Sequence, residues 1–253
     1  MKSLVFSLLL CVSGLALAEP PTLVIIIDDL GYELDAGEKA AALPGKVNLS
    51  ILPHTPNGAT IARLGMAAGK EIMLHAPMSN VLAKPLGKGA LTESMREAEL
   101  RRVLAQGIDS TPGVRGVNNH MGSLLTSQSE PMTWVMEELA HRGLYYVDSR
   151  TTAKTVAADM ADRRGVPSLS RNVFLDNEID AAAIHFRFKE FLAIADDEGM
   201  AIAIGHPHEE TLAYLRRQLP RLERRGYQLK LVSEVLAPQL AKSKSAAAPA
   251  ASE

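Results

Sequence analysis

Two adjacent carboxylates end a β-branched apolar stretch, where Asp28 and Asp29 follow the Val-Ile-Ile-Ile run at 24–27. Burying a charged group is costly unless it is paired or holds a metal, so packing alone does not explain two acids here. Successive side chains leave an extended chain in opposite directions. One acid could therefore hold a metal ion while its neighbour faces a reacting water. The alternative is a turn at the strand end, in which one Asp caps the next helix.

Histidines recur in the same setting. Of the seven in the chain, His75 and His120 each end an apolar run directly, and His206 and His208 follow another. His206 and His208 share one face if the chain is extended there, a conformation that the intervening proline favours. The alternative for this pair is to cap the helix that follows them. His54 also follows a predicted strand, but prolines on both sides favour an ordinary loop.

Three further polar residues stand at predicted strand ends. Asp148 ends one strand, and Asn118 and Asn119 directly precede His120. Asn119 and Asp148 could contact a substrate or support the metal ligands. Asn118 and Asn119 could also be turn residues, and Asp148 could brace a loop.

Carboxylates and imidazoles together form a ligand set that suits Zn²⁺ and other divalent transition metals. Three protein ligands and one open position indicate a catalytic site. A bound metal would lower the pKa of a water and polarise a carbonyl oxygen. A carboxylate could then take the water's proton, and a histidine could protonate the leaving group. Such a site hydrolyses an amide or an ester, and the residues alone leave a peptide amide or a phosphoester open as substrates.

Apolar runs alternate with amphipathic segments over about 220 residues, enough for one sizeable α/β domain. This alternation favours parallel strands joined by crossover helices, so we expect a distorted (β/α) barrel, with an open doubly wound sheet as the alternative. In a barrel the carboxyl ends of the strands share one rim. The predicted strands are 22–28, 47–52, 71–74, 113–117, 144–147, 173–175, 201–204 and 228–231, and the predicted helices are 60–68, 95–108, 131–142, 181–198 and 210–225.

The two ends of the chain differ from this pattern. Residues 1–18 combine Lys2, a short apolar run and Ala-Leu-Ala, which is typical of a secretory signal peptide. We therefore expect export across the inner membrane to the periplasm, with no stable membrane anchor after cleavage. Residues 242–253 are rich in Ala, Ser and Lys and are predicted to be a disordered tail, which leaves 19–241 as the folded domain.

Composition excludes some classes of protein. Cys11 is the only cysteine and lies in the predicted signal, so the mature chain has neither disulfides nor thiolate metal ligands. A net charge of −2 and 4% aromatic residues argue against nucleic-acid binding.

Five motifs in sequence order resemble the divergent polysaccharide deacetylases, a secreted bacterial group distantly similar to the metal-dependent deacetylases of carbohydrate esterase family four. The resemblance covers 22–235. Each motif is weak alone, but five at successive strand ends are more specific. The motifs are Ile26-Ile27-Asp28-Asp29-Leu30-Gly31, Leu74-His75-Ala76-Pro77-Met78, Asn119-His120-Met121-Gly122-Ser123, Val147-Asp148-Ser149 and Gly205-His206-Pro207-His208.

The resemblance implies a distorted barrel that removes N-acetyl groups from a carbohydrate polymer with a divalent metal, expected to be Zn²⁺. It implies that Asp28 is the base, Asp29 a metal ligand and His206 the acid. His75 matches the first histidine of the superfamily's HxxxH ligand motif.

The second histidine of that motif is replaced by Ser79. We expect His120 to take its place as the third metal ligand. Asn119, Asp148 and His208 are then candidates for substrate contact or for support of the ligands.

A second hypothesis is a catalytically inactive envelope protein that binds glycan or a protein partner through the same rim. The serine at the expected ligand position favours it. So does the low aromatic content, because sugar-processing grooves usually offer rings for stacking.

Overall fold

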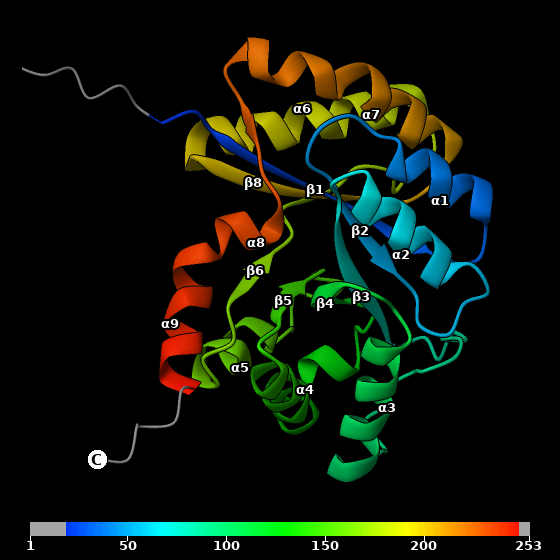
Figure 1. The fold of residues 1–253 in the computed structure, drawn as a ribbon, viewed down its shortest axis with the longest axis vertical. Coiled ribbons are helices and arrows are strands. Elements are labelled where there is room, and N and C mark those ends of the chain that lie inside the picture. The colour runs from blue at the N-terminus through cyan, green and yellow to red at the C-terminus, as the bar shows by residue number, and fades with distance from the viewer. Residues whose placement is uncertain (1–18, 248–253) are drawn as a thin grey trace, which may run out of the picture.

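The computed structural model describes residues 19–247, and the predicted signal at 1–18 lies outside them. These residues form one parallel sheet flanked by helices (Figure 1). The strands are β1 (Thr22–Leu30), β2 (Asn48–Ile51), β3 (Glu71–Met78), β4 (Val114–Met121), β5 (Tyr145–Asp148), β6 (Ser168–Ser170), β7 (Val173–Phe174), β8 (Met200–Gly205) and β9 (Gln228–Leu229). The helices are α1 (Leu34–Ala41), α2 (Gly58–Ala67), α3 (Glu97–Asp109), η1 (Leu125–Ser127), α4 (Ser129–Arg142), α5 (Ala157–Arg163), α6 (Ala181–Glu198), α7 (Glu209–Leu222), η2 (Glu223–Arg225), α8 (Val232–Val235) and α9 (Ala237–Ala247).

The sheet is curled into a half barrel. Its strand order is β6-β5-β4-β3-β2-β1-β8-β7, with β9 beside β1. β6 and β7 stand at opposite ends of this order, yet only residues 171–172 connect them along the chain. The two ends of the sheet must therefore lie close together, which a flat sheet does not allow. The prediction of a distorted barrel of parallel strands is confirmed, and all carboxyl ends of the strands share one rim.

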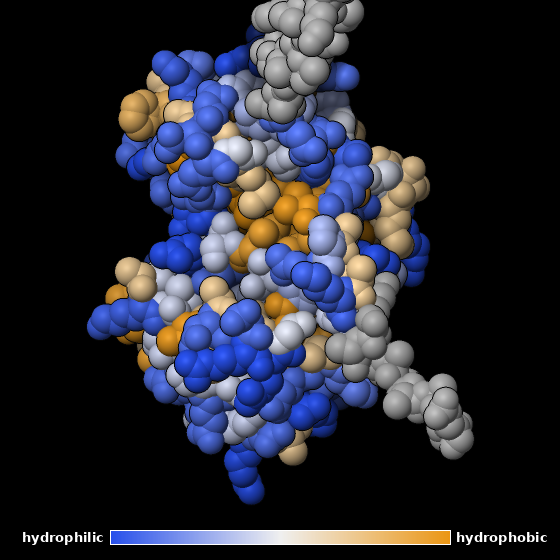
Figure 2. All heavy atoms as spheres, turned by 90° about the vertical axis from the view of Figure 1, so that its left-hand side faces the viewer, coloured by the Kyte–Doolittle hydropathy of each residue, from blue (hydrophilic) through white to orange (hydrophobic). Residues whose placement is uncertain are grey.

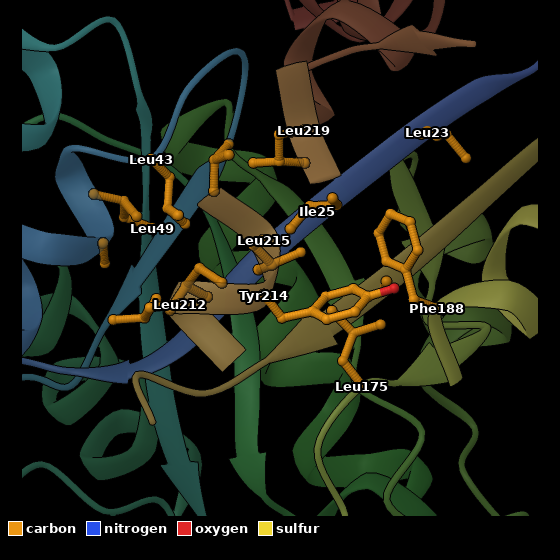
Figure 3. Close-up of a cluster of buried hydrophobic side chains, with 14 of the residues drawn as sticks. Leu23, Ile25, Leu43, Leu49, Leu175, Phe188, Leu212, Tyr214, Leu215 and Leu219 are labelled. Carbon is orange, nitrogen blue, oxygen red and sulfur yellow. The ribbon is translucent and has the colours of Figure 1, made fainter. Parts of the chain in front are cut away.

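Strand β1 is buried on both faces, as its unbroken apolar run predicts. Leu23 and Ile25 point outward into a core under α6 and α7, which Figure 3 shows with Phe188 and Leu215. Val24 and Ile26 point into the curl of the sheet, where they belong to a second cluster. Each such fully buried side chain contributes about 1.5–3 kcal/mol of hydrophobic stabilisation, so β1 is a rigid base for the acids at its end.

The cluster inside the curl is closed at one end by the C-terminal helices. Val232 and Leu236 are buried in it, and Val235 and Leu240 pack against it while partly exposed. On the side of the molecule that carries α9, apolar side chains also gather in a hollow between more hydrophilic surfaces (Figure 2). Within residues 19–247 no helix has the length and apolarity required to cross a bilayer.

Several predicted boundaries were wrong. β3 and β4 each extend four residues beyond the predicted ends, so the polar residues expected after them lie within paired strands. β6, α1, α5, α8 and α9 were not predicted. The C-terminal segment expected to be disordered from Lys242 is helical as far as Ala247, because α9 continues through it.

Candidate functional site

Three side chains from three strands converge at the carboxyl rim of the sheet. Asp29 Oδ1 lies 3.1 Å from His75 Nε2 and 2.8 Å from His120 Nδ1. The two ring nitrogens are 3.2 Å apart. The structure therefore brings together the three residues predicted to bind a metal.

The register of β3 and β4 places the two histidines. His75 pairs with Asn118 across the two strands, and Pro77 pairs with His120. Because residues two apart in a strand share a face, His120 lies on the same side of β4 as Asn118 and hence on the side of His75. Ser79 falls just past the end of β3, where its hydroxyl donates to Glu93 Oε2 at 2.5 Å and does not reach the three ligands.

The two acids of β1 face the same histidine. His75 Nε2 lies 3.7 Å from Asp28 Oδ2 and 3.1 Å from Asp29 Oδ1. The expectation that they point in opposite directions was wrong. Pairing with β2 shifts register between Ile27 and Leu30, and Asp29 has a φ of 57°. This left-handed conformation, which costs about 1–2 kcal/mol in a non-glycine residue, turns the second carboxylate toward the first.

Asn118 fixes the tautomer of His75. Its side-chain nitrogen donates to Asp28 Oδ1 at 2.8 Å, and a carboxylate can only accept. The amide oxygen therefore faces His75 Nδ1 at 2.7 Å and also accepts from Ser50 Oγ. His75 Nδ1 must carry a hydrogen to donate to that oxygen. In the neutral ring, Nε2 then presents its lone pair to Asp29 and His120.

These contacts fit a divalent metal ion. Asp29 Oδ1 is buried and receives no well-directed hydrogen bond from the residues that the structure describes. It instead faces two ring nitrogens at hydrogen-bond distance, so three atoms able to donate electron pairs point at one spot. A histidine that binds a metal usually donates its other ring N–H to an oxygen acceptor, which fixes the orientation of the ring, and His75 does this with Asn118. The residues present therefore fit a metal with three protein ligands.

The two acids have opposite pKa shifts. Burial raises the pKa of Asp28 above its ordinary value, and the nearby His75 and His206 offset this only in part. Burial alone would raise the pKa of Asp29 as well. The close contacts of its carboxylate with His120 and His75, and the charges of these rings, outweigh it and hold that pKa far below the ordinary range. Asp29 is therefore the permanent anion suited to bind a cation, and Asp28 is the stronger base.

Burial lowers the pKa of His75, but the charges of Asp28 and Asp29 outweigh this and raise it overall. In the absence of a cation, the acids thus hold a proton on His75. A metal ion would replace that proton.

His206 forms a second unit on the same rim, with Asp176. His206 Nδ1 lies 2.8 Å from Asp176 Oδ1, while Asp176 Oδ2 accepts from the His206 backbone N at 2.6 Å and from Thr211 Oγ1 at 2.8 Å. Burial would lower the pKa of His206, but the bond to Asp176 raises it to about 9. The ring is therefore protonated at neutral pH, with Nε2 left to donate.

Asp176 was not among the predicted site residues. It directly follows the predicted strand 173–175, so the criterion that selected the other rim acids also applies to it. Asn118 was considered only as a turn residue, although it belongs to β4 and contacts both Asp28 and His75.

The three residues predicted to support the site have other surroundings. Asn119 faces away from the ligands, since its oxygen accepts from Ser149 N and Tyr146 Oη. Its side-chain nitrogen donates to the carbonyl of Met121. His208 is the residue before α7 and does not cap that helix through its side chain. Its ring lies 6.1 Å from that of His206, close enough to form a second group with Asp176 that could hold a metal.

Asp148 braces the loop between β5 and α5. It accepts from Arg150 N at 2.8 Å and from Thr155 Oγ1 at 2.9 Å. Arg171 holds the same loop from the other side by donating to the carbonyls of Ser149 and Arg150. This is the loop-bracing alternative considered for Asp148 from the sequence.

The remaining histidines take no part in this rim cluster. His54 lies in an exposed loop with a φ of 55°. His141 and His185 are exposed on helices, as predicted, and His185 Nδ1 contacts Tyr214 Oη at 2.8 Å.

The chain is similar to known proteins in sequence and in fold. Residues 25–236 match the family model described as divergent polysaccharide deacetylase. A curated relative, the uncharacterized protein YibQ of Escherichia coli K12, is 35% identical over 219 residues, which are 87% of this chain and 68% of that protein.

Two solved structures share the fold. The uncharacterized protein ATU2773 from Agrobacterium tumefaciens C58 has a TM-score of 0.82 at 22% identity, over 86% of this chain and 90% of that one. BA3943 from Bacillus anthracis, described as a CE4 family pseudoenzyme, has a TM-score of 0.54 at 12% identity, over 86% of this chain and 66% of that one. From the match over 25–236 and the identity to YibQ, this chain belongs to the divergent polysaccharide deacetylase family.

Proposed function

We propose that the protein is a metal-dependent hydrolase that removes N-acetyl groups from a polysaccharide. The observation that carries the proposal is the convergence of Asp29 Oδ1, His75 Nε2 and His120 Nδ1 beside a second, more basic carboxylate. Three protein ligands with an open position, next to a carboxylate base, form an arrangement that supports metal-assisted hydrolysis. Membership of a deacetylase family implies a polysaccharide as the substrate.

Asp29, His75 and His120 would hold the ion. Two imidazoles and a carboxylate suit Zn²⁺, which we propose as the metal. When bound, such an ion lowers the pKa of a coordinated water and polarises the acetyl carbonyl.

Asp28 is the proposed general base. Its Oδ2 lies 3.7 Å from His75 Nε2, so the carboxylate is next to the ligands without being needed as one of them. Asn118 holds its other oxygen, which leaves Oδ2 to take a proton from the attacking water. The raised pKa of Asp28 brings its basicity closer to that needed near neutral pH.

His206 is the proposed general acid. Its Nδ1 is held by Asp176, and its pKa of about 9 keeps the ring protonated at neutral pH. Gly205 pairs with Ile27, so His206 and Asp28 follow paired residues of neighbouring strands and lie near the same point of the rim. Donation from Nε2 would let the sugar nitrogen leave as an amine.

Acetate release from an N-acetylated glycan by the zinc-loaded protein tests this function. Asp28→Asn should reduce turnover by about 10²–10⁴-fold, the usual contribution of a general base, without loss of the metal. Asp162→Asn changes an exposed acid on α5 and should leave turnover unchanged. A fully loaded wild-type protein that releases no acetate would defeat the catalytic proposal and favour a glycan-binding protein.

We also propose a periplasmic location, supported by the signal-like sequence of residues 1–18. Fusion of these residues to an export-dependent reporter tests it. A reporter retained in the cytoplasm would contradict this location.

A further inference from the structure

Two hollows lie near His120 at the carboxyl rim. A hollow of about 750 Å³ begins at Met121, the residue after His120, and lies between the loops that follow β3 and β5. A smaller one of about 210 Å³ is lined by His120 itself together with Tyr32, Pro53 and Pro77. The larger is within the range of about 300–1,000 Å³ that is usual for ligand sites. A linear ligand whose reacting group meets the metal ligands could thus extend into the hollow lined by His120 and into the one that begins at Met121.

The loop after β3 contributes to both hollows and is held in place. Asn80 Oδ1 accepts from the backbone N of Leu82 at 3.1 Å and of Lys84 at 3.0 Å, and Asn80 Nδ2 donates to the carbonyl of Lys84 at 3.1 Å. Lys84 is therefore fixed through both of its backbone polar groups. The backbone N of Val81 donates to Ser123 Oγ at 3.1 Å, which ties the loop to the end of β4. These bonds hold the loop in place where it lines the larger hollow.

Charge is distributed unevenly around the hollows. Lys84 and Lys154 line the larger one, and Lys88 lines the smaller one. Among the described residues that line either hollow there is no Asp or Glu, although the whole chain has 29 acids and 27 lysines and arginines. The hollows therefore favour a ligand that carries negative charge.

Exposed apolar side chains stand beside these lysines. Val81 and Leu82, next to Lys84, are 66% and 70% exposed. Tyr32 is 52% exposed, and its ring borders the smaller hollow. Tyrosine and aliphatic groups pack against the C–H faces of sugar rings, because these faces are apolar while the hydroxyl edges remain polar. The surface thus combines contacts for sugar faces with contacts for anions.

We propose that the two hollows form one groove for an acidic polysaccharide. In such a polymer the carboxylates lie either on the N-acetylated sugars themselves or on the sugars that alternate with them. This proposal rests on the proposed function, which places the reacting sugar of the polymer at the metal ligands. It adds the chemical class of the polymer. Lys84 and Lys154 would contact carboxylates in the larger hollow, and Lys88 in the smaller one. Tyr32 would pack against a sugar ring beside His120.

Binding is the direct test, because it does not require turnover. Calorimetric titration of the zinc-loaded wild-type protein would use three probes of equal length. Peptide-free peptidoglycan strands carry lactyl carboxylates, hyaluronan oligosaccharides carry uronic acids, and chitin oligosaccharides are neutral. At low ionic strength we expect at least one acidic probe to bind about ten-fold more tightly than the neutral one. The difference should shrink in 1 M salt, where the screening length falls to about 3 Å. The identity of the tighter acidic probe distinguishes the two sources of carboxylate.

Variants of the lysines test which side chains contribute to binding of the acidic probe. Lys84→Gln combined with Lys154→Gln should weaken binding of the acidic probe about five- to ten-fold, since exposed ion pairs contribute about 0.2–1 kcal/mol each. Lys88→Gln should weaken it less, and none of these variants should change binding of the neutral probe. Lys189→Gln, an exposed lysine on α6, is the matched control and should have no effect.

The outcomes separate this inference from the proposed function. Equal affinity for acidic and neutral probes, or selectivity untouched by the lysine variants, would overturn the acidic groove even if acetate is released. Selective, lysine-dependent binding without acetate release would support the groove and defeat the deacetylase.

Discussion

Among the single residues of the site, Asn118 links the base to a metal ligand, because its amide donates to Asp28 and accepts from His75. Asn118→Ala should weaken metal binding by about 10–100-fold, the usual effect of losing a group that orients a metal ligand. Competition titration with a chelating dye would measure the affinity. Ser50→Ala removes another donor to the same amide oxygen but leaves the bond to His75, so it should have a much smaller effect. Equal affinities in all three proteins would show that the amide does not orient the histidine.

The Asp176–His206 pair makes a prediction for pH dependence. Because Asp176 raises the pKa of His206 to about 9, the active protonated form is lost only as pH rises through that value. Asp176→Asn should move the alkaline limb of kcat/KM down toward the ordinary histidine pKa of about 6.5. Thr211→Val removes one donor to Asp176 but leaves the bond between Asp176 and His206. The alkaline limb of kcat/KM in this variant should therefore stay near that of the wild type. An unchanged alkaline limb in Asp176→Asn would contradict the role of His206 as acid.

The raised pKa of His206 also makes the free energy of unfolding depend on pH. The pKa of His206 is raised in the folded state, so its contribution to the free energy of unfolding is fully present below about pH 6.5 and is lost as pH rises through about 9.

The sequence drew attention to Asp29, His75 and His120 because each stands at the end of an apolar run. The family resemblance assigned Asp29 and His75 as metal ligands, and His120 was added because it ends the next strand. It did not predict that Asn118 joins Asp28 to His75. That contact depends on which residues of β3 and β4 lie side by side, and register is a property of the paired strands rather than of either strand alone. Asp176 could have been found, since it too follows an apolar run.

Within the secondary-structure elements, we expect alanine substitutions at two glycines to change the free energy of unfolding in opposite directions. A Cβ on Gly116 of β4 would clash with the ring of Tyr145 on β5, so Gly116→Ala should lower the free energy of unfolding by about 1–3 kcal/mol. In α3, a Cβ on Gly107 would meet its nearest neighbour, Leu74, at 3.4 Å, an ordinary contact. Gly107→Ala should therefore raise that free energy by about 0.4–1 kcal/mol by reducing the freedom of the unfolded chain.

Urea unfolding measures both glycine variants. Equal effects of the two substitutions would contradict the packing of β4 against β5.

The strand lengths show what local pattern cannot predict. Residues 75–78 and 118–121 are mixed polar and apolar, and Pro77 lacks a backbone donor, so the pattern indicates that both strands end earlier. Pairing nevertheless continues as far as Met78 and Met121, because each strand supplies the other's hydrogen-bonding partner. The extension carries His120 to the rim beside His75 and makes Ser79 unnecessary as a ligand.

At the scale of the whole molecule, the curled sheet is what makes distant residues neighbours. Alternation of strands and helices was sufficient to predict parallel strands with a common rim. It could not predict that residues 171 and 172 would join the two ends of the sheet, or that Gly205 of β8 would pair with Ile27 of β1 and so bring His206 beside Asp28. Closure of the curl depends on β6, which has only three half-buried residues and little local signal.

The most direct test of the account is the metal content of the purified protein after equilibration with Zn²⁺ and removal of the excess. We predict one tightly held ion per chain in the wild type, its loss in His75→Ala, and its retention in His141→Ala, which changes an exposed histidine on α4. Equal zinc content in all three proteins, or none in the wild type, would contradict a metal centre at Asp29, His75 and His120.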